Sequence, residues 1–141
     1  MDKNAYFWQV MDGKLAPPGA AATLNIAFTH IDADAGTIET TFEAGAGFTN
    51  PAGHVQGGFL AAMLDDTMGP ALAATLAAGE IAPTLNLNVS FERVAKVGTL
   101  SGKGRVLRRG REVCFLAGEL YQDGQRVASA TATALVRKVP T

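Results

Sequence analysis

One long apolar segment, residues 57–78, constrains the fold of this chain more than any other feature. It is dominated by Ala, Leu and Met, a composition that predicts an α-helix. Its only charged residues are Asp65 and Asp66, and a helix that is apolar nearly all round must be buried on most sides. The Gly-Pro pair at 69–70 is expected to kink or divide the helix, because proline has no N–H to donate, and Gly79 is expected to end it.

Strand patterns stand on both sides of this helix. Residues 24–29 and 37–43 alternate apolar and polar around a turn at 32–36, which predicts a hairpin. The segment 85–92 alternates strictly after the helix. Further strands are expected at 99–109, 113–117 and 127–136, the last two joined by a turn at Asp123-Gly124. This order predicts an α+β domain in which one helix packs on a curved antiparallel sheet of five to six strands.

Length and composition limit the class of protein. The 141 residues fit one domain, 1–141, and residues 1–18 are expected to form a helical flap that ends at Pro17-Pro18. Twelve basic and thirteen acidic residues leave a net charge of -1, which argues against a nucleic-acid partner. One cysteine and two histidines make a disulfide framework or a metal site unexpected. No signal or membrane-spanning pattern occurs, so we expect a cytoplasmic protein without a membrane partner.

A carboxylate inside an apolar helix needs a physical reason, because burying one without a partner costs several kcal/mol. Asp65, Asp66 or both could cap a helix kink or face a wet subunit boundary. Alternatively, one of them serves as a general base or nucleophile in an apolar pocket.

The segment just before the helix, residues 50–58, offers a complementary feature. The first N–H groups of a helix have no partner within it, and the helix dipole favours negative charge there. Gly57 and Gly58 leave this end accessible, so a carbonyl oxygen bound there would be polarised as in an oxyanion hole. Tight packing of the helix on the sheet is the alternative reason for the two glycines.

Asn50, Gly53 and the run QGGFLAAMLD at residues 56–65 resemble the signature of hotdog-fold acyl-CoA thioesterases, in particular the phenylacetate-pathway (PaaI-like) group. The order of strands and helix is similar over nearly the whole chain. The resemblance implies a hotdog fold and hydrolysis of an aryl- or fatty acyl-CoA to the free acid and coenzyme A. It implies no cofactor, since coenzyme A is part of the substrate.

The same resemblance implies roles for individual residues. The N–H of Gly57 and the side chain of Asn50 would polarise the thioester carbonyl. Asp65 would activate water or attack the carbonyl directly, and both possibilities stay open. Thr84, which begins the strand after the helix, would orient the water.

One position departs from the family pattern. The family usually has a histidine directly before Gly-Gly, where this chain has Gln56. Glutamine can position a carbonyl, so Gln56 and Gly58 are expected to bind substrate. The side chain of Gln56 cannot transfer a proton near neutral pH. His54, two residues earlier, is expected to point elsewhere.

Helix geometry predicts that the site needs two subunits. Gly57 and Asp65 are eight residues apart, or about 12 Å along a helix at ~1.5 Å per residue. One water cannot contact both within one chain, so two antiparallel helices from a homodimer must supply them. The resemblance implies the same dimer with acyl-CoA as its partner molecule, and a dimer of dimers is left open.

Five basic residues cluster within nine positions, in and directly after the expected strand 99–109. They are Lys103, Arg105, Arg108, Arg109 and Arg111. The cluster is either a solvated hairpin tip or a binding site for the phosphates of coenzyme A. Its last three arginines lie at the expected turn.

Two other functions remain compatible with the same fold. A non-catalytic acyl-CoA-binding sensor is the main alternative, although a pure binder gains nothing from a desolvated Asp65. A dehydratase or hydratase is a third candidate, and the absence of a histidine at position 56 argues against it.

Overall fold

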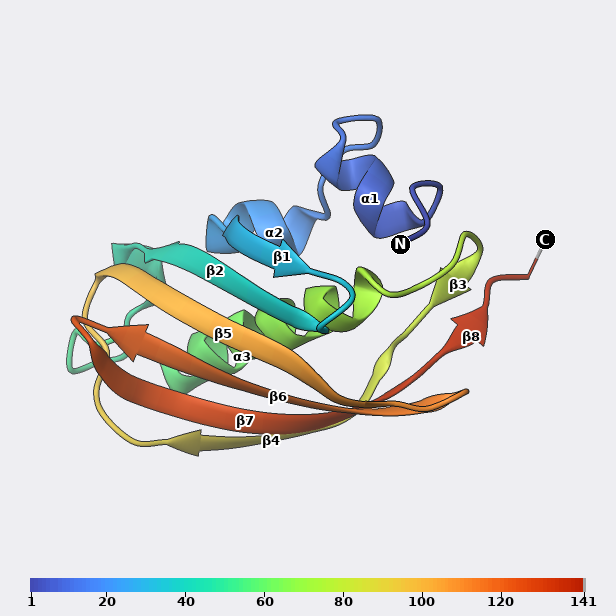
Figure 1. Cartoon of the computed structure of the whole chain (residues 1–141). Coiled ribbons are helices and arrows are strands. Elements are labelled where there is room, and N and C mark those ends of the chain that lie inside the picture. The colour runs from blue at the N-terminus through green and yellow to red at the C-terminus, as the bar shows by residue number, and fades with distance from the viewer. Residues whose placement is uncertain (141) are drawn as a thin grey trace.

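A curved antiparallel sheet wraps around one long helix in the computed structural model, which describes residues 1–140 (Figure 1). The helix is α3 (Gly57–Ala73) and the sheet has the strand order β1-β2-β5-β6-β7-β4. The strands are β1 (Ala27–Asp32), β2 (Thr37–Ala44), β4 (Thr84–Phe91), β5 (Gly98–Arg109), β6 (Val113–Gln122) and β7 (Gln125–Leu135). The expected α+β hotdog architecture is thereby confirmed.

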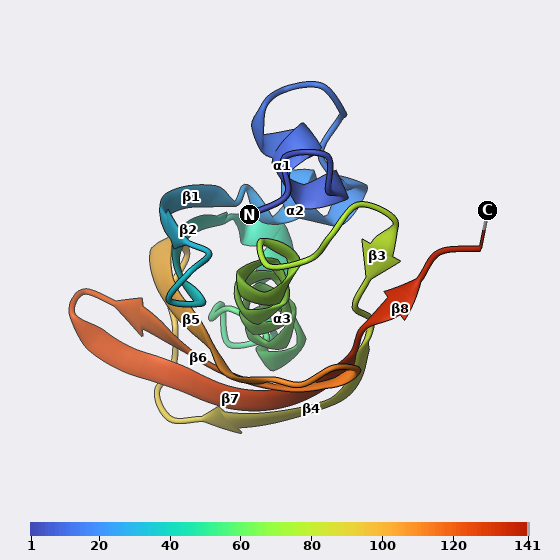
Figure 2. The same cartoon turned by 45° about the vertical axis from the view of Figure 1, so that its right-hand side comes forward.

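Smaller elements surround this framework. Helices α1 (Tyr6–Met11) and α2 (Gly19–Leu24) lie across α3 from the sheet, as Figure 2 shows. A 3-10 turn, η1 (Ala46–Phe48), precedes α3, and β3 (Glu80–Ile81) pairs with β8 (Arg137–Lys138) beyond the end of the main sheet. No helix within residues 1–140 is long and apolar enough to cross a membrane.

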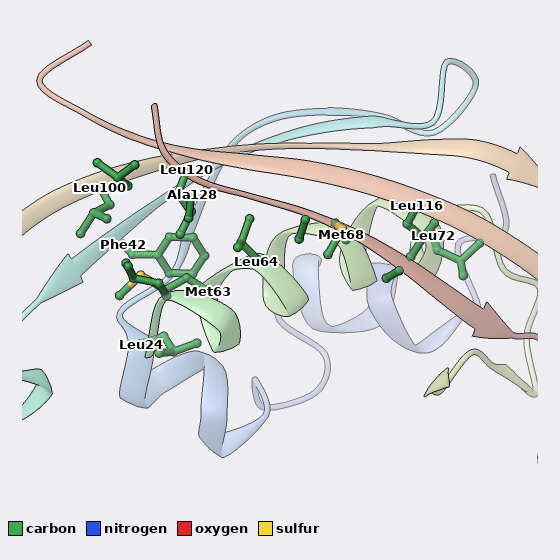
Figure 3. Close-up of a cluster of buried hydrophobic side chains, with 14 of the residues drawn as sticks. Leu24, Phe42, Met63, Leu64, Met68, Leu72, Leu100, Leu116, Leu120 and Ala128 are labelled. Atoms are coloured by element: carbon green, nitrogen blue, oxygen red, sulfur yellow. The ribbon is translucent and has the colours of Figure 1, made fainter. Parts of the chain in front are cut away.

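The core lies between α3 and the concave face of the sheet. Figure 3 shows apolar side chains of α3 directed at the strands, and these contacts bury Met63, Leu64, Met68, Leu72, Phe42, Leu100, Leu116 and Leu120 almost completely. Burial of this kind stabilises the fold by about 1.5–3 kcal/mol for each large apolar side chain. The sheet therefore holds α3 in one place, and with it every residue that α3 carries.

Glycines let the helix come close to the strands. A Cβ atom at Gly104 would lie 2.9 Å from the backbone oxygen of Thr67, and one at Gly118 would lie 2.8 Å from Cγ of Met68. At the same contact the hydroxyl of Thr67 donates to the carbonyl of Met63 at 2.8 Å and shares a 2.9 Å hydrogen bond with the hydroxyl of Thr40. Both threonines are buried, and these bonds satisfy their oxygens.

The helix differs from its expected form at its C-terminal end. It runs through Pro70 undivided and ends at Ala73, not near Ala78. The hydrogen bond that Pro70 cannot donate is offset by burial of the residues directly after it, Ala71 and Leu72, at 2% and 0% exposure. Gly79 adopts a φ of +82° in the following loop and does not end the helix.

The N-terminal segment also differs from the expectation. Residues 19–24 form helix α2, and the strand that was expected from residue 24 begins at Ala27. Pro18 is extended at the N-cap, three alanines follow, and Asn25 ends the helix in the left-handed conformation at φ 53°. Alanine propensity and these two end residues outweigh the short alternating pattern, so the helical flap extends beyond residue 18.

Replacing Gly104 by alanine is expected to lower the free energy of unfolding by about 1–3 kcal/mol, because the new methyl group meets the backbone of α3. Chemical denaturation measures the change. Gly47→Ala is the matched control, since nothing lies within 4 Å of a Cβ atom there. Equal stability of the two variants would contradict the close approach of β5 to α3.

Candidate active site

Asp65 and Thr84 form a side-chain pair between α3 and the start of β4. The hydroxyl of Thr84 donates to Oδ1 of Asp65 at 2.9 Å, and both residues are partly buried. Thr84 is held in place because β4 pairs with β7, where its register partner is Ala134. Two of the residues predicted from the sequence are thus in direct contact, while their catalytic roles stay predictions, and the second carboxylate oxygen of Asp65 stays available to another donor.

Asn50 closes the turn that leads into α3. Its Oδ1 accepts the N–H groups of Ala52 and His54 at 3.0 and 3.1 Å, and its backbone N–H donates to the carbonyl of His54 at 2.7 Å. Gly53 adopts a φ of +83° inside the turn, where a residue with a Cβ atom would be strained. Because Oδ1 is used within the turn, the Nδ2 amide is the part of Asn50 that is left to donate to a ligand.

A cavity of about 370 Å³ lies where this turn meets the start of α3, and we call it the loop–helix cavity. Asn50, His54, Gly57 and Phe91 are among its lining residues. His54 lines this cavity as well, and the expectation that its side chain points elsewhere stays a prediction. The ring of Phe91 lies close to the backbone of Gly57, and a Cβ atom at this position would lie only 3.1 Å from the ring.

Two further predicted substrate-binding residues lie at the helix start. Gln56 is the N-cap residue of α3, yet its side chain makes no capping hydrogen bond, and both Gln56 and Gly58 are exposed. The N–H groups of Gly57 and Gly58 have no acceptor within the helix. This end of α3 therefore presents unpaired donors at the surface, beside the loop–helix cavity.

One chain does not bring the two halves of the predicted site together. Gly57 and Asn50 line the loop–helix cavity, which does not include Asp65 or Thr84. The single helix α3 separates Gly57 from Asp65 by about 12 Å along its axis. The two parts of the predicted site are therefore apart within one chain, and the expectation that a second chain completes the site stays a prediction.

Asp66 lies on a different side of α3 from Asp65. Its Oδ2 atom is buried without a hydrogen-bond partner in the described part of the chain. Burial raises the pKa of Asp66 from 3.8 to about 6, and the neighbouring charge of Asp65 adds to the rise. The two adjacent carboxyl groups thus have different surroundings, one paired with a hydroxyl group and the other unpaired.

The three arginines of the expected turn do not act as one cluster. Arg108 and Arg109 belong to β5, so the turn is shorter than expected, and Arg108 is exposed. Arg109 reaches the end of α3, where its Nε donates to the hydroxyl of Thr75 at 3.3 Å and its Nη2 lies 4.0 Å from Oε1 of Glu80. Arg109 therefore ties β5 to the loop after α3.

Arg111 lies with two basic residues that sequence reasoning missed. Together with Arg137 and Lys138 of β8 it lines a cavity of about 540 Å³ that also includes Glu80 and Glu112. The basic pair near the C-terminus carries no motif. It is placed beside Arg111 by the pairing of β8 with β3 and by the hydrogen bond from the N–H of Val136 to the carbonyl of Glu112. No group of three or more His, Cys, Asp or Glu residues in 1–140 could hold a metal ion.

The chain is similar to proteins of known structure over most of its length. A phenylacetic acid degradation-related protein from Ralstonia eutropha JMP134 is 47% identical, with a TM-score of 0.90 and coverage of 92% of this chain and 98% of that chain. The PaaI protein of the E. coli phenylacetic acid degradation operon is 20% identical, with a TM-score of 0.80 and coverage of 95% and 94%. A thioesterase from Haemophilus influenzae is 18% identical, with a TM-score of 0.81 and coverage of 91% and 89%. The last two likenesses show the fold alone.

A search of curated proteins found no match to the sequence. A family model described as the thioesterase superfamily does match, over residues 52–129. This range is more than half of the chain, and it includes all of α3, the strand that carries Thr84, and most of the remaining sheet. The chain belongs to the thioesterase superfamily.

Proposed function

We propose that this thioesterase-family chain hydrolyses the thioester of an aryl- or fatty acyl-CoA to the free acid and coenzyme A. The observation that carries the proposal is the 2.9 Å hydrogen bond from Thr84 to Asp65. It gives a carboxylate in an otherwise apolar helix a fixed orientation. A carboxylate fixed in this way, with one oxygen still available, is suited to take a proton from water.

In the proposed reaction, Asp65 is the general base. The water that Thr84 helps to orient gives its proton to the available carboxylate oxygen while its own oxygen bonds to the thioester carbon. The tetrahedral intermediate then collapses, the carbon–sulfur bond breaks, and the thiolate of coenzyme A takes up the proton held by Asp65, which regenerates the carboxylate. Direct attack by Asp65, with a mixed anhydride as intermediate, is the alternative chemistry of the same residue.

The negative charge that develops on the carbonyl oxygen needs donors. The N–H of Gly57 at the start of α3 and the Nδ2 amide of Asn50 supply them in our proposal. Gln56 and Gly58, exposed beside them, would contact the substrate as it enters. The site needs no metal and no cofactor in this proposal.

We propose that a homodimer completes each site, with α3 of one subunit antiparallel to α3 of its partner. The edge strand β4 supports this arrangement, because it is the last strand of the sheet and its far edge has no neighbour within the described chain. Its Leu85 and Phe91 are exposed at 60% and 56%, which is unusual for large apolar residues. A second copy of β4 would cover them and extend the sheet.

The coenzyme A moiety would bind at basic residues. Arg111 is the favoured member of the predicted arginines, because it shares its cavity with Arg137 and Lys138. Arg108 is exposed and free to contribute, whereas Arg109 is already engaged with Thr75 and Glu80. Phosphate binding by such a cluster depends on charge and weakens as salt rises.

Replacing Asp65 by asparagine is expected to lower kcat for acyl-CoA hydrolysis about 10²–10⁴-fold, because the amide cannot accept the proton from water. Thiol release from a panel of aryl- and fatty acyl-CoAs measures the loss. Asp34→Asn, the same change at an exposed residue of the β1–β2 turn, is the control and should leave kcat unchanged. Binding of acyl-CoA without turnover by the wild type would favour the sensor alternative and refute hydrolysis.

Mixing two inactive variants is expected to restore activity if each site spans two subunits. Asn50→Ala and Asp65→Asn remove groups that the proposal assigns to different chains of one site. A mixed dimer then has one intact site and one doubly defective site, so random exchange of subunits should restore about a quarter of wild-type activity. Thiol release before and after refolding the mixture measures it, and no recovery would place both groups in the same chain.

The unpaired carboxyl of Asp66 is expected to make stability depend on pH. Its pKa is raised from 3.8 to about 6 in the folded chain, so the protonated form favours folding. That contribution is complete below pH 3.8 and is lost as the pH rises through about 6. Asp66→Asn does not titrate, and its stability relative to wild type should rise by up to about 3 kcal/mol between pH 4 and pH 8. Denaturation across this range tests it, and a difference that does not vary with pH would contradict it.

A further inference from the structure

Asp66 directly follows the proposed general base, Asp65, in α3. Residues 44–79 contain no Lys or Arg, and Asp65 and Asp66 are their only acidic residues. Neither carboxyl group belongs to a salt bridge within residues 1–140. The Oδ2 atom of Asp66 is also buried without a hydrogen-bond partner in this part of the chain, although nearly all buried polar atoms in proteins have one. The charge of Asp66 is therefore not balanced by another group of the described chain.

The groups that face Asp66 are almost all apolar. Asp66 lines a cavity of about 440 Å³ between α3 and the N-terminal helices, which cover the side of α3 that the sheet leaves free (Figure 2). Among residues 1–140, Tyr6 of α1 is the only other titratable residue in this lining. Helix α2, strand β1 and the segment before β4 contribute Ala21, Phe28 and Ala82. Charges interact more strongly in such surroundings than in water, so the adjacent charge of Asp65 has the largest effect.

The interaction between the two carboxyl groups acts in both directions. Burial raises the pKa of Asp66 from 3.8 to about 6, and the charge of Asp65 adds to the rise. Two interacting acids titrate as a pair, so the charge of Asp66 in turn favours proton uptake by Asp65. A hydrogen-bond donor at Oδ2 of Asp66 would spread that charge and weaken this effect. The unpaired oxygen, which is otherwise a cost to the fold, keeps the effect at full strength.

The proposed reaction moves negative charge away from Asp66. The proton that water gives up neutralises Asp65, which is one helix position from Asp66, about 1.5 Å along the axis and 100° around it. The negative charge then develops on the carbonyl oxygen of the thioester, on the far side of the water from Asp65. Proton transfer thus relieves the repulsion between the two aspartates.

We propose that the charged carboxylate of Asp66 strengthens Asp65 as the general base of hydrolysis. Asp66 acts through Asp65 and touches neither the water nor the thioester, so it is a supporting residue and not a catalytic one. The inference rests on the proposed function and adds a second carboxyl group to its site. Because Asp66 takes up a proton as the pH falls through about 6, its support is present above that pH and is lost below it.

The pH dependence of the single-turnover rate constant for acyl-CoA hydrolysis tests the proposal. Besides the loss of activity when Asp65 itself is protonated, the wild type is expected to show a second step centred near pH 6. Asp66→Asn carries no charge at any pH and should lack this step. Its rate constant should match the wild type at about pH 5 and be about three- to tenfold lower at about pH 8, the loss expected when one nearby charge no longer supports the base. Asp66→Glu keeps the charge and should restore the step.

Two further comparisons decide how the profile is interpreted. Asp34→Asn removes one negative charge from an exposed residue of the β1–β2 turn and should leave the step in place. A loss of activity in Asp66→Asn that is equal at every pH would indicate a merely structural role and would overturn the proposal. A step that persists in Asp66→Asn would overturn it as well.

Titration of the carboxyl groups by carbon-13 NMR tests the coupling without turnover. Asp65→Asn removes the neighbouring charge, so the titration midpoint of Asp66 should move to a lower pH than in the wild type. A midpoint that does not move would overturn the proposal. A wild type that hydrolyses no acyl-CoA would instead refute the proposed function, and the two failures are distinguishable because only the second is seen in the wild type's turnover.

Discussion

The burial of α3 is the constraint on which the rest of the structure depends. The helix is apolar nearly all round, so the sheet must curve around it and the N-terminal helices must cover what the sheet leaves. Small residues at the contact, such as Gly104 and Gly118, allow the strands to approach its backbone. The same packing partly buries Asp65 and Asp66, and the surroundings of the two carboxyl groups then differ.

The two carboxyl groups differ in their hydrogen-bond partners. Asp65 has a hydroxyl partner from β4, which fixes its position. Asp66 has no partner for one oxygen, so its charged form is disfavoured. A single turn of helix thus holds one carboxyl group with a hydroxyl partner and another whose charged form is disfavoured by burial. The separation of Gly57 and Asp65 along α3 is the reason why we propose that a second chain supplies the donors at Gly57.

The long, strongly patterned elements were predictable from the sequence, and the short ones were not. The strict alternation of β4 and the composition of α3 gave their type and approximate bounds, because each is a long run with one clear pattern. Helix α2 and strand β8 were not predicted, because their sequence patterns are too short. The pattern of α2 is three alanines after Pro18, and that of β8 is a basic pair at 137–138. In the site, the sequence indicated Thr84 and Asp65 as candidates, the structure adds the hydrogen bond between them, and their catalytic roles stay predictions. The cavity that Asp66 lines was not predicted, because it depends on how α1 and α2 pack against α3.

A cavity of about 440 Å³ between α3 and the N-terminal helices bears on how such a protein diverges. Much of its wall comes from residues 6–28, which precede the range 52–129 matched by the family model. Changes in that wall leave the contacts between α3 and the sheet intact, and they also leave Asp65 and Thr84 in place. The size and chemistry of this cavity can therefore change in one segment while the matched range is retained. Exchanging that segment between relatives would change the cavity without rebuilding the core.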